Sequence, residues 1–312
     1  MQTDVNLWLE NKNVPNYLKD ELLQHQNDQE YLTEAFTGKL DFGTAGMRGL
    51  MGPGTNRMNI FTIGQVTKGL AIFMDELGEE IKNRGVVICY DPRYHSKDFA
   101  DYAAMILGAQ GITVYLFDSI RATPELSFTI RELNTYAGIM ITASHNSKEY
   151  NGYKIYGPDG GQMPPAEVDN VVKYADQVED IFNIETTPIT DLRAQGLLTL
   201  IGEDVDEKYL ARLREVNIDH KLIAEAGKDL AIVYTPLHGA GNILYRRMFN
   251  ENGFMNINVV AKQAIIDPEF VTAKSPNPEF PEVFAQGIEV AKQTGAQIII
   301  ADRKSTRLNS SH

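Results

Sequence analysis

A serine, a histidine and a lysine stand close together in the middle of the sequence. Ser144 and His145 belong to the run Thr142–Asn146 (Thr-Ala-Ser-His-Asn), and Lys154 follows ten residues after the serine. A serine that carries a phosphoryl group brings about −1.5 to −2 charges at neutral pH and needs fixed cations beside it. A polar loop between the two residues that folds back over the Ser144 hydroxyl would place the Lys154 cation beside it. These residues therefore suggest a phosphoryl carrier at Ser144.

The element before this run predicts where the serine lies. The apolar segment Ala137–Ile141 is typical of a short buried strand. The serine would then follow the carboxyl end of a strand, where open α/β sheets bind their ligands. The Gly-x-Ser-x-Gly pattern of hydrolases and the phosphate-binding Walker loop are both absent. His145, adjacent in sequence, is expected to point away from Ser144, which argues against a Ser–His base pair.

Length and composition indicate the number of domains and exclude several classes of function. A chain of 312 residues favours two domains, and a formal net charge of −13 argues against binding to nucleic acid or to anionic membranes. The amino terminus lacks the features of a secretory signal, and no apolar run is long enough to cross a bilayer. The single cysteine, Cys89, fits a small buried residue in a strand. We expect a cytoplasmic protein; the oligomeric state stays open.

The order of apolar and polar segments predicts two α/β domains after a helical arm. Residues 1–38 have helical patterns, and strands and helices then alternate, as expected for parallel or mixed sheets covered by helices. The stretch Glu185–Gly202 loses this periodicity, so we place the domain boundary there. The predicted units are a helical arm at 1–38, a first domain at 39–186 and a second domain at 203–301.

The last eleven residues, Asp302–His312, differ sharply from the rest. They have no apolar pattern, and they match the in-frame translation of a sequencing-library adapter at every position. We expect a non-native tail at 302–312 and an amino-terminal fragment of a longer protein, and we assign the tail no function.

Several motifs together resemble the α-D-phosphohexomutases, in particular the phosphoglucomutase/phosphomannomutase branch with an amino-terminal helical arm. The matching segments are Phe42–Gly49, Gly54–Asn59, Tyr90–Arg93 with Ser96, Ala122–Leu126, Thr142–Asn146, Tyr150–Lys154, Gly157–Gln162, Tyr234–Gly239 and Ser275–Pro278. They occur in the family's order and at its spacing over residues 1–301. The resemblance implies two consecutive α/β/α domains with mixed sheets, the first two of the family's four.

The resemblance also implies an activity and a set of site residues. The activity is a reversible shift of phosphate between C1 and C6 of glucose, through a phosphoserine and glucose 1,6-bisphosphate, with Mg²⁺ as cofactor. Ser144 would be the phosphoserine, Lys154 the acid–base residue and Arg48 a phosphate-binding cation. His145 would help to position the reacting groups, and Thr142 and Asn146 would contribute to phosphate binding. Arginine offers phosphate two parallel donors, whereas lysine can exchange a proton where a site depresses its pKa.

Some alternatives stay open. Phosphomannomutase, phosphopentomutase and a non-catalytic phosphosugar-binding or interaction protein remain, because the specificity residues and the metal-binding carboxylates would follow Ala301. We therefore expect little or no turnover from this chain alone. Asp91 and Arg93 fit a structural ion pair under the serine loop as well as a substrate contact. His238 fits either a turn or a domain interface, and Tyr150, Tyr153 and Tyr156 are interpreted as packing residues.

Overall fold

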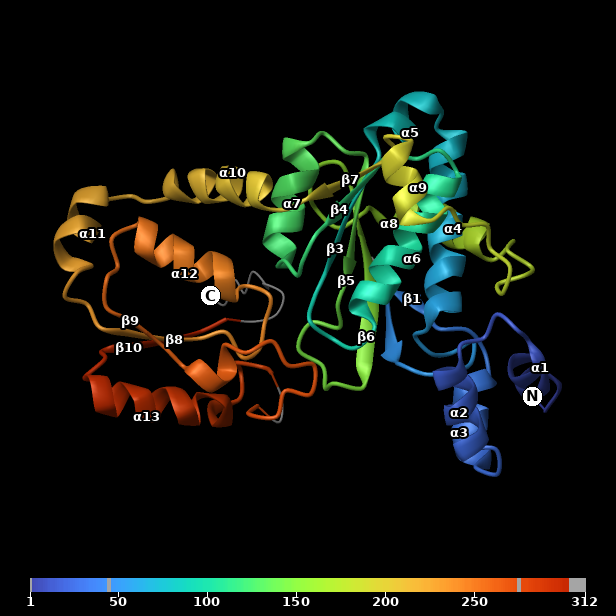
Figure 1. The fold of residues 1–312 in the computed structure, drawn as a ribbon, viewed down its shortest axis with the longest axis horizontal. Helices are drawn as coiled ribbons and strands as arrows, with labels where there is room; N and C mark the ends of the chain where they lie inside the picture. Colours follow the sequence, from blue (N-terminus) through green and yellow to red (C-terminus); the bar gives the residue numbers. More distant parts are fainter. Residues whose placement is uncertain (1, 44–45, 274–275, 303–312) are drawn as a thin grey trace.

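The computed structural model describes residues 2–43, 46–273 and 276–302 (Figure 1). Three helices form an amino-terminal arm: α1 (Gln2–Glu10), α2 (Asn16–Gln24) and α3 (Gln29–Phe36). The Trp8 ring is buried edge-on against Phe36, Phe61 and Phe182 at centroid distances of 5.8, 5.2 and 5.5 Å. The arm therefore packs on the first domain through one aromatic cluster, in agreement with the helices expected before residue 39.

The first domain contains a seven-stranded mixed sheet in the order β1-β2-β6-β5-β3-β4-β7. Its strands are β1 (Phe42–Gly43), β2 (Gly46–Leu50), β3 (Val86–Tyr90), β4 (Val114–Phe117), β5 (Ala137–Ile141), β6 (Tyr150–Tyr156) and β7 (Leu198–Ile201). Strands β5, β3, β4 and β7 pair in parallel, whereas β1, β2, β6 and β5 pair antiparallel. The parallel strands are apolar because helices cover both faces.

The helices of the first domain divide between the two faces of this sheet (Figure 1). They are α4 (Ile60–Glu76), α5 (Glu79–Arg84), α6 (Ser96–Ala109), α7 (Thr123–Glu132), α8 (Pro165–Ala175) and α9 (Ile189–Ala194). The larger core lies under α4, α6 and α8, and the smaller core lies under α7. Cys89, in the middle of β3, is fully buried in the smaller core, and burial raises the pKa of its thiol. The expectation of a buried cysteine is confirmed.

The predicted end of the first domain needs correction. The sequence loses its clear periodicity at residues 185–202, which is why the boundary was predicted there, yet this stretch contains α9 and β7. Strand β7 pairs in parallel with β4 and completes the sheet, so the first domain extends past residue 186. Pro188 and Gly196, which suggested a linker, lie just outside α9 and β7. The pairing of β7 with β4 joins residues far apart in sequence, so a local sequence pattern could not reveal it.

The second domain has a three-stranded parallel sheet in the order β10-β8-β9. Its elements are α10 (Glu203–Arg214), α11 (His220–Ala226), β8 (Ile232–Thr235), α12 (Asn242–Glu251), β9 (Ile257–Val259), the 3₁₀ helices η1 (Ala261–Gln263) and η2 (Pro281–Phe284), α13 (Ala285–Thr294) and β10 (Ile298–Ala301). Helices α12 and α13 lie on opposite sides of this sheet (Figure 1). The α/β/α architecture of both domains is confirmed, although the described strands of the second sheet are all parallel.

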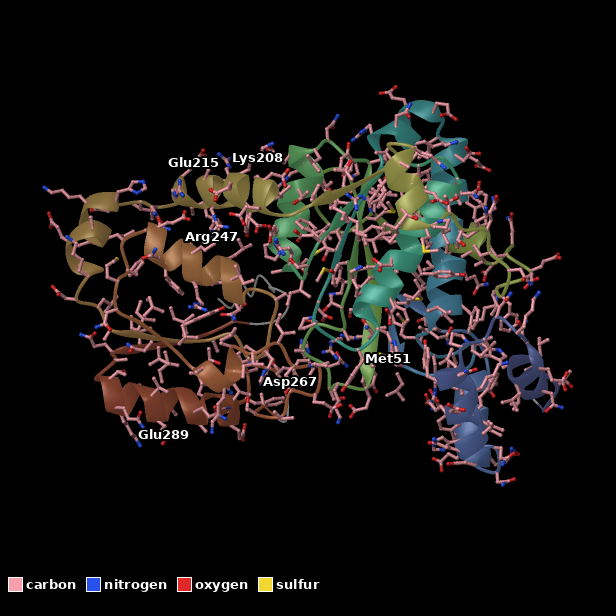
Figure 2. The ribbon with its side chains drawn as sticks, in the orientation of Figure 1. Met51, Lys208, Glu215, Arg247, Asp267 and Glu289 are labelled. Atoms are coloured by element: carbon pink, nitrogen blue, oxygen red, sulfur yellow. The ribbon has the colours of Figure 1, made fainter. Side chains whose placement is uncertain are left out.

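Helix α10 connects the two domains. Toward the first domain, Asp206 accepts two hydrogen bonds from the Arg121 guanidinium, at 2.8 and 2.9 Å. Lys208 pairs with Glu132 of α7 at 2.9 Å. Toward the second domain, Arg247 of α12 pairs with two glutamates of α10, at 3.0 and 2.5 Å (Figure 2). The buried Arg121–Asp206 pair is the most enclosed of these contacts.

Candidate active site

The candidate serine lies in a tight turn directly after β5. All five residues of β5 are buried, and the turn closes with a hydrogen bond of 3.2 Å from the Asn146 amide to the Ala143 carbonyl. Ser144 has a φ of 59°, in the left-handed region, and is partly exposed. The turn thus presents the Ser144 hydroxyl at the carboxyl end of a parallel strand, as the sequence predicted.

Asp91 supports this turn from below. It follows β3, the neighbour of β5, and is 1% exposed. Its carboxylate accepts hydrogen bonds from the hydroxyls of Thr142 and Ser96, at 2.7 and 2.8 Å. The Thr142 hydroxyl in turn accepts the Ser144 amide at 2.9 Å. Thr142 is fully buried, so its position fits a residue that orients the serine turn better than one that touches phosphate.

Arg93 holds the backbone of the same turn. Its guanidinium donates to four carbonyl oxygens: those of Asn146 (2.6 Å), Ser147 (2.7 Å), Tyr150 (2.8 Å) and Ser144 (3.3 Å). Its Nε lies 3.2 Å from an Asp91 oxygen, and burial lowers the pKa of the guanidinium. Of the two roles left open for Asp91 and Arg93, the structure supports the structural ion pair. A buried guanidinium suits this role because its planar donors can reach several acceptors at once.

Arg48 and Lys154 lie on the same face of the sheet. Arg48, on β2, is paired with Gly152 of β6, and Lys154, on β6, is paired with Gly46 of β2. Paired residues share a face, and so do residues two apart on one strand, so the two cations are diagonal neighbours. The Arg48 guanidinium donates to the Asn146 side-chain oxygen at 3.1 Å. This contact brings a cation from β2 to the serine turn, as expected.

Glycine is required at position 152 for this arrangement. A Cβ added to Gly152 would lie 2.6 Å from the Thr142 carbonyl oxygen and 3.0 Å from that of Met47. Both obstacles are backbone atoms, which cannot rotate away as a side chain can. The close approach of β6 to its neighbouring strands therefore depends on the missing side chain.

We expect Gly152→Ala to lower the free energy of unfolding by about 1–3 kcal/mol, because the strands beside β6 must move apart. Urea denaturation measures the change. Gly157→Ala is the matched control, since an added Cβ there meets nothing nearer than 3.5 Å. Equal stability of the two variants would contradict the close-approach argument.

His145 lies nearer to Ser144 than the sequence suggested. The Ser144 Oγ is 3.3 Å from His145 Nδ1, whereas adjacent side chains are expected to diverge. The left-handed φ of Ser144 turns the chain at this point, which explains why the expectation from regular backbone is wrong. The serine turn therefore makes two side-chain contacts, Ser144 with His145 and Asn146 with Arg48.

The sequence did not show that the second domain reaches this turn. Lys148, just after the turn, pairs with Glu269 at 2.5 Å, and the Phe270 ring lies 5.6 Å from the Arg93 guanidinium carbon. Neither Glu269 nor Phe270 belongs to a helix or strand, and no local pattern marks them. The sequence admits two roles for His238; its ring contacts the loop that carries Glu269 and Phe270.

The structure also bears on three predictions made outside the site: the packing of the tyrosines, the absence of a membrane span and the carboxyl-terminal tail. Tyr153 and Tyr156 are buried, in agreement with a packing role. None of the helices in the described part of the chain is long and apolar enough to cross a membrane. Asp302 is buried after β10, with its amide bonded to the Thr235 carbonyl at 2.9 Å, and residues 303–312 of the expected tail lie outside the described ranges.

A magnesium site is not complete in the described residues. Within 2–43, 46–273 and 276–302, no three His, Cys, Asp or Glu side chains gather in a way that could hold a metal ion. Mg²⁺ prefers six oxygen ligands in octahedral geometry, so a single carboxylate such as Asp302 does not fit the ion on its own.

Comparisons with known proteins agree with this geometry. Residues 39–181 match the family model "Phosphoglucomutase/phosphomannomutase, alpha/beta/alpha domain I", and residues 207–302 match the model of domain II. The chain is 37% identical over 302 residues to a phosphoglucomutase of Staphylococcus aureus (strain bovine RF122 / ET3-1), covering 96% of this chain and 52% of that protein. It thus spans about half the length of the curated relatives it matches.

Solved structures with the same fold include two bacterial proteins. One, from Thermus thermophilus and assigned to the phosphomannomutases, gives a TM-score of 0.68 at 22% identity, covering 85% of this chain and 55% of the other. The other is a phosphoglucomutase/phosphomannomutase family protein from Burkholderia thailandensis, with a TM-score of 0.61 at 20% identity, covering 84% and 52%. The two consecutive domain matches, joined to the serine turn and its cations, place this chain in the phosphoglucomutase/phosphomannomutase family.

Proposed function

We propose that the protein is the front part of an enzyme that interconverts glucose 1-phosphate and glucose 6-phosphate. The reaction would pass through a phosphoserine at Ser144 and a glucose 1,6-bisphosphate intermediate. The observation that carries the proposal is the serine turn itself: a partly exposed hydroxyl beyond β5, with His145 at 3.3 Å and Arg48 bonded to the same turn. The names of the relatives favour glucose phosphates over mannose or pentose phosphates.

In the proposed reaction, a sugar hydroxyl oxygen attacks the phosphorus, and the bond from phosphorus to Ser144 Oγ breaks. Lys154 relays the proton from the attacking hydroxyl to the departing serine oxygen. Arg48 stabilises charge on the transferred group, and His145 orients it. Phosphoryl transfer depends mainly on alignment and charge stabilisation, so a rigid turn beside fixed cations is the main requirement.

The sugar-recognition residues and the remaining ligands of Mg²⁺ would come from parts of the protein beyond those described here. We propose that the Ser144 phosphate is one ligand of that ion. The chain alone is expected to show little or no turnover, because it spans about half the length of the relatives it matches. A coupled assay from glucose 1-phosphate to glucose 6-phosphate with near-native activity would contradict this expectation.

Phosphopeptide analysis tests the central proposal. The complete gene product, purified from its source, should carry phosphate on the peptide that contains Ser144, and incubation with glucose 6-phosphate should remove it. A non-catalytic phosphosugar-binding protein would bind the sugar phosphate and carry no such label. Phosphate on another side chain of an active enzyme would contradict the assignment of Ser144.

A further inference from the structure

A loop of the second domain, residues 265–273, extends to the serine turn of the first domain. The loop is braced internally by Asp267, whose carboxylate accepts the amides of Glu269 and Val271, at 2.9 and 3.1 Å. Asp267 lies on the side of the second domain that faces the first (Figure 2). These bonds give the 265–273 loop a fixed shape, although it belongs to no helix or strand.

His238 fixes both ends of the 265–273 loop. Its Nδ1 lies 2.7 Å from the Ile265 carbonyl oxygen, and its Nε2 lies 2.6 Å from the Thr272 hydroxyl. A carbonyl oxygen only accepts, so His238 Nδ1 donates the hydrogen bond to Ile265. The ring is 2% exposed, which keeps water from competing for either bond.

The braced loop makes two contacts with the first domain. Glu269 pairs with Lys148 at 2.5 Å and also hydrogen-bonds Tyr94. The Phe270 ring lies 5.6 Å from the Arg93 guanidinium carbon and is 3% exposed. Phe270 has a φ of 51°, an unfavourable backbone conformation for a bulky residue, so its surroundings must hold it in place.

Arg93 links Phe270 to the serine. The same guanidinium that lies beside the Phe270 ring donates to the four carbonyls of the 144–150 segment. An aromatic ring beside a guanidinium attracts the charge and excludes water from its donors. Water admitted to Arg93 would compete for the carbonyls, and the turn would lose part of its support.

We propose that Phe270 is a positioning residue for the serine turn, acting through Arg93, and that the 265–273 loop is the means by which the second domain keeps the Ser144 hydroxyl aligned. Its catalytic meaning rests on the proposed function, whereas the mechanical link between Phe270 and the turn can be measured without any turnover.

Hydrogen–deuterium exchange on this chain measures how strongly Phe270 supports the serine turn. The amides of Ser144, Asn146 and Tyr150 are hydrogen-bonded within the turn and its flank, so they report on it. Phe270→Ala should raise their exchange about tenfold, the scale of a lost cation–π contact in a desolvated site. Phe270→Tyr, which keeps the ring, should stay within about twofold of the wild type.

Val271→Ala is the matched control, because that side chain is 76% exposed on the same loop. The control should exchange as the wild type does, and peptides from β8 should be unchanged in every variant, which shows that the second domain stays folded. Unchanged exchange of the turn in Phe270→Ala would overturn the proposal. An equal rise in β8 peptides would also overturn it, because the effect would then be general unfolding.

A kinetic measurement separates this inference from the proposed function. In the complete enzyme, Phe270→Ala should lower kcat about tenfold with little change in KM, because alignment rather than binding is lost. Absence of phosphate on Ser144 would defeat the proposed function and leave the exchange result standing. A normal kcat in a phosphorylated Phe270→Ala enzyme would defeat the positioning role alone.

Discussion

Alanine at position 144 should remove the phosphoryl carrier and lower turnover of the complete enzyme by on the order of 10⁴-fold or more, the scale of losing a covalent nucleophile. The turn itself should survive, because alanine keeps the Ser144 carbonyl that Arg93 binds and the Ser144 amide that donates to the Thr142 hydroxyl. The change is thus chemical rather than structural. A coupled assay for glucose 6-phosphate, together with phosphopeptide analysis, measures both expected losses.

Ser147→Ala is the matched control for this experiment. Ser147 is an exposed serine of the same loop, and alanine keeps the carbonyl that Arg93 binds. The control should retain the phosphate label and most of the activity. Wild-type turnover in the complete Ser144→Ala enzyme would show that another residue carries the phosphoryl group.

Removal of the Arg121 guanidinium should lower the free energy of unfolding more than the Gly152→Ala substitution does. Arg121 binds Asp206 through two hydrogen bonds and lies 3.7 Å from Glu125, and all three side chains are buried. Burial, and then the neighbouring Asp206, raise the pKa of Glu125 well above its usual range. Without the guanidinium, two acidic groups would be left together in an apolar interior beneath α7 and α10.

We expect Arg121→Leu to lower the free energy of unfolding by about 3–5 kcal/mol at pH 8, the cost of leaving a buried charge without its partner. The loss should shrink as the pH falls toward 5, because the uncompensated carboxyls bind protons more tightly in the folded than in the unfolded state. Urea denaturation at pH 5, 6.5 and 8 measures both effects.

Arg131→Leu is the control, since Arg131 is an exposed arginine of α7, the helix that begins just after Arg121. Its effect should stay within about 0.5 kcal/mol at every pH, as is usual for surface substitutions. An Arg121→Leu variant as stable as this control at pH 8 would show that water reaches the carboxyls and that the pair is not truly enclosed.

The sequence predicted the parts of this molecule that depend on local pattern. The strand Ala137–Ile141, the turn after it and the helical arm follow from apolar periodicity and from glycine and proline positions, and all appear as expected. The approach of Arg48 to the serine turn was predicted from the family motifs rather than from local pattern. Its physical basis is strand pairing, which the structure supplies through Gly152.

The features that the sequence missed depend on contacts between distant segments. Strand β7 can be identified only from its pairing with β4. A role for Phe270 can be inferred only from its contact with Arg93. The position of His145 depends on one left-handed residue, Ser144, whose φ no apolar pattern encodes. Periodicity reports which face of an element is buried, but it does not report which partner covers that face.

The burial of Cys89 gives this chain an internal reporter of its own motions. It is the single cysteine of the sequence, it lies at the centre of the parallel strands, and its sulfur contacts the Arg121 carbonyl at 3.2 Å. A thiol reagent can reach it only when the sheet beneath α7 opens, so the rate of labelling measures how often that opening occurs. The rate at which the first-domain sheet opens beneath α7 can therefore be measured without adding a probe to the protein.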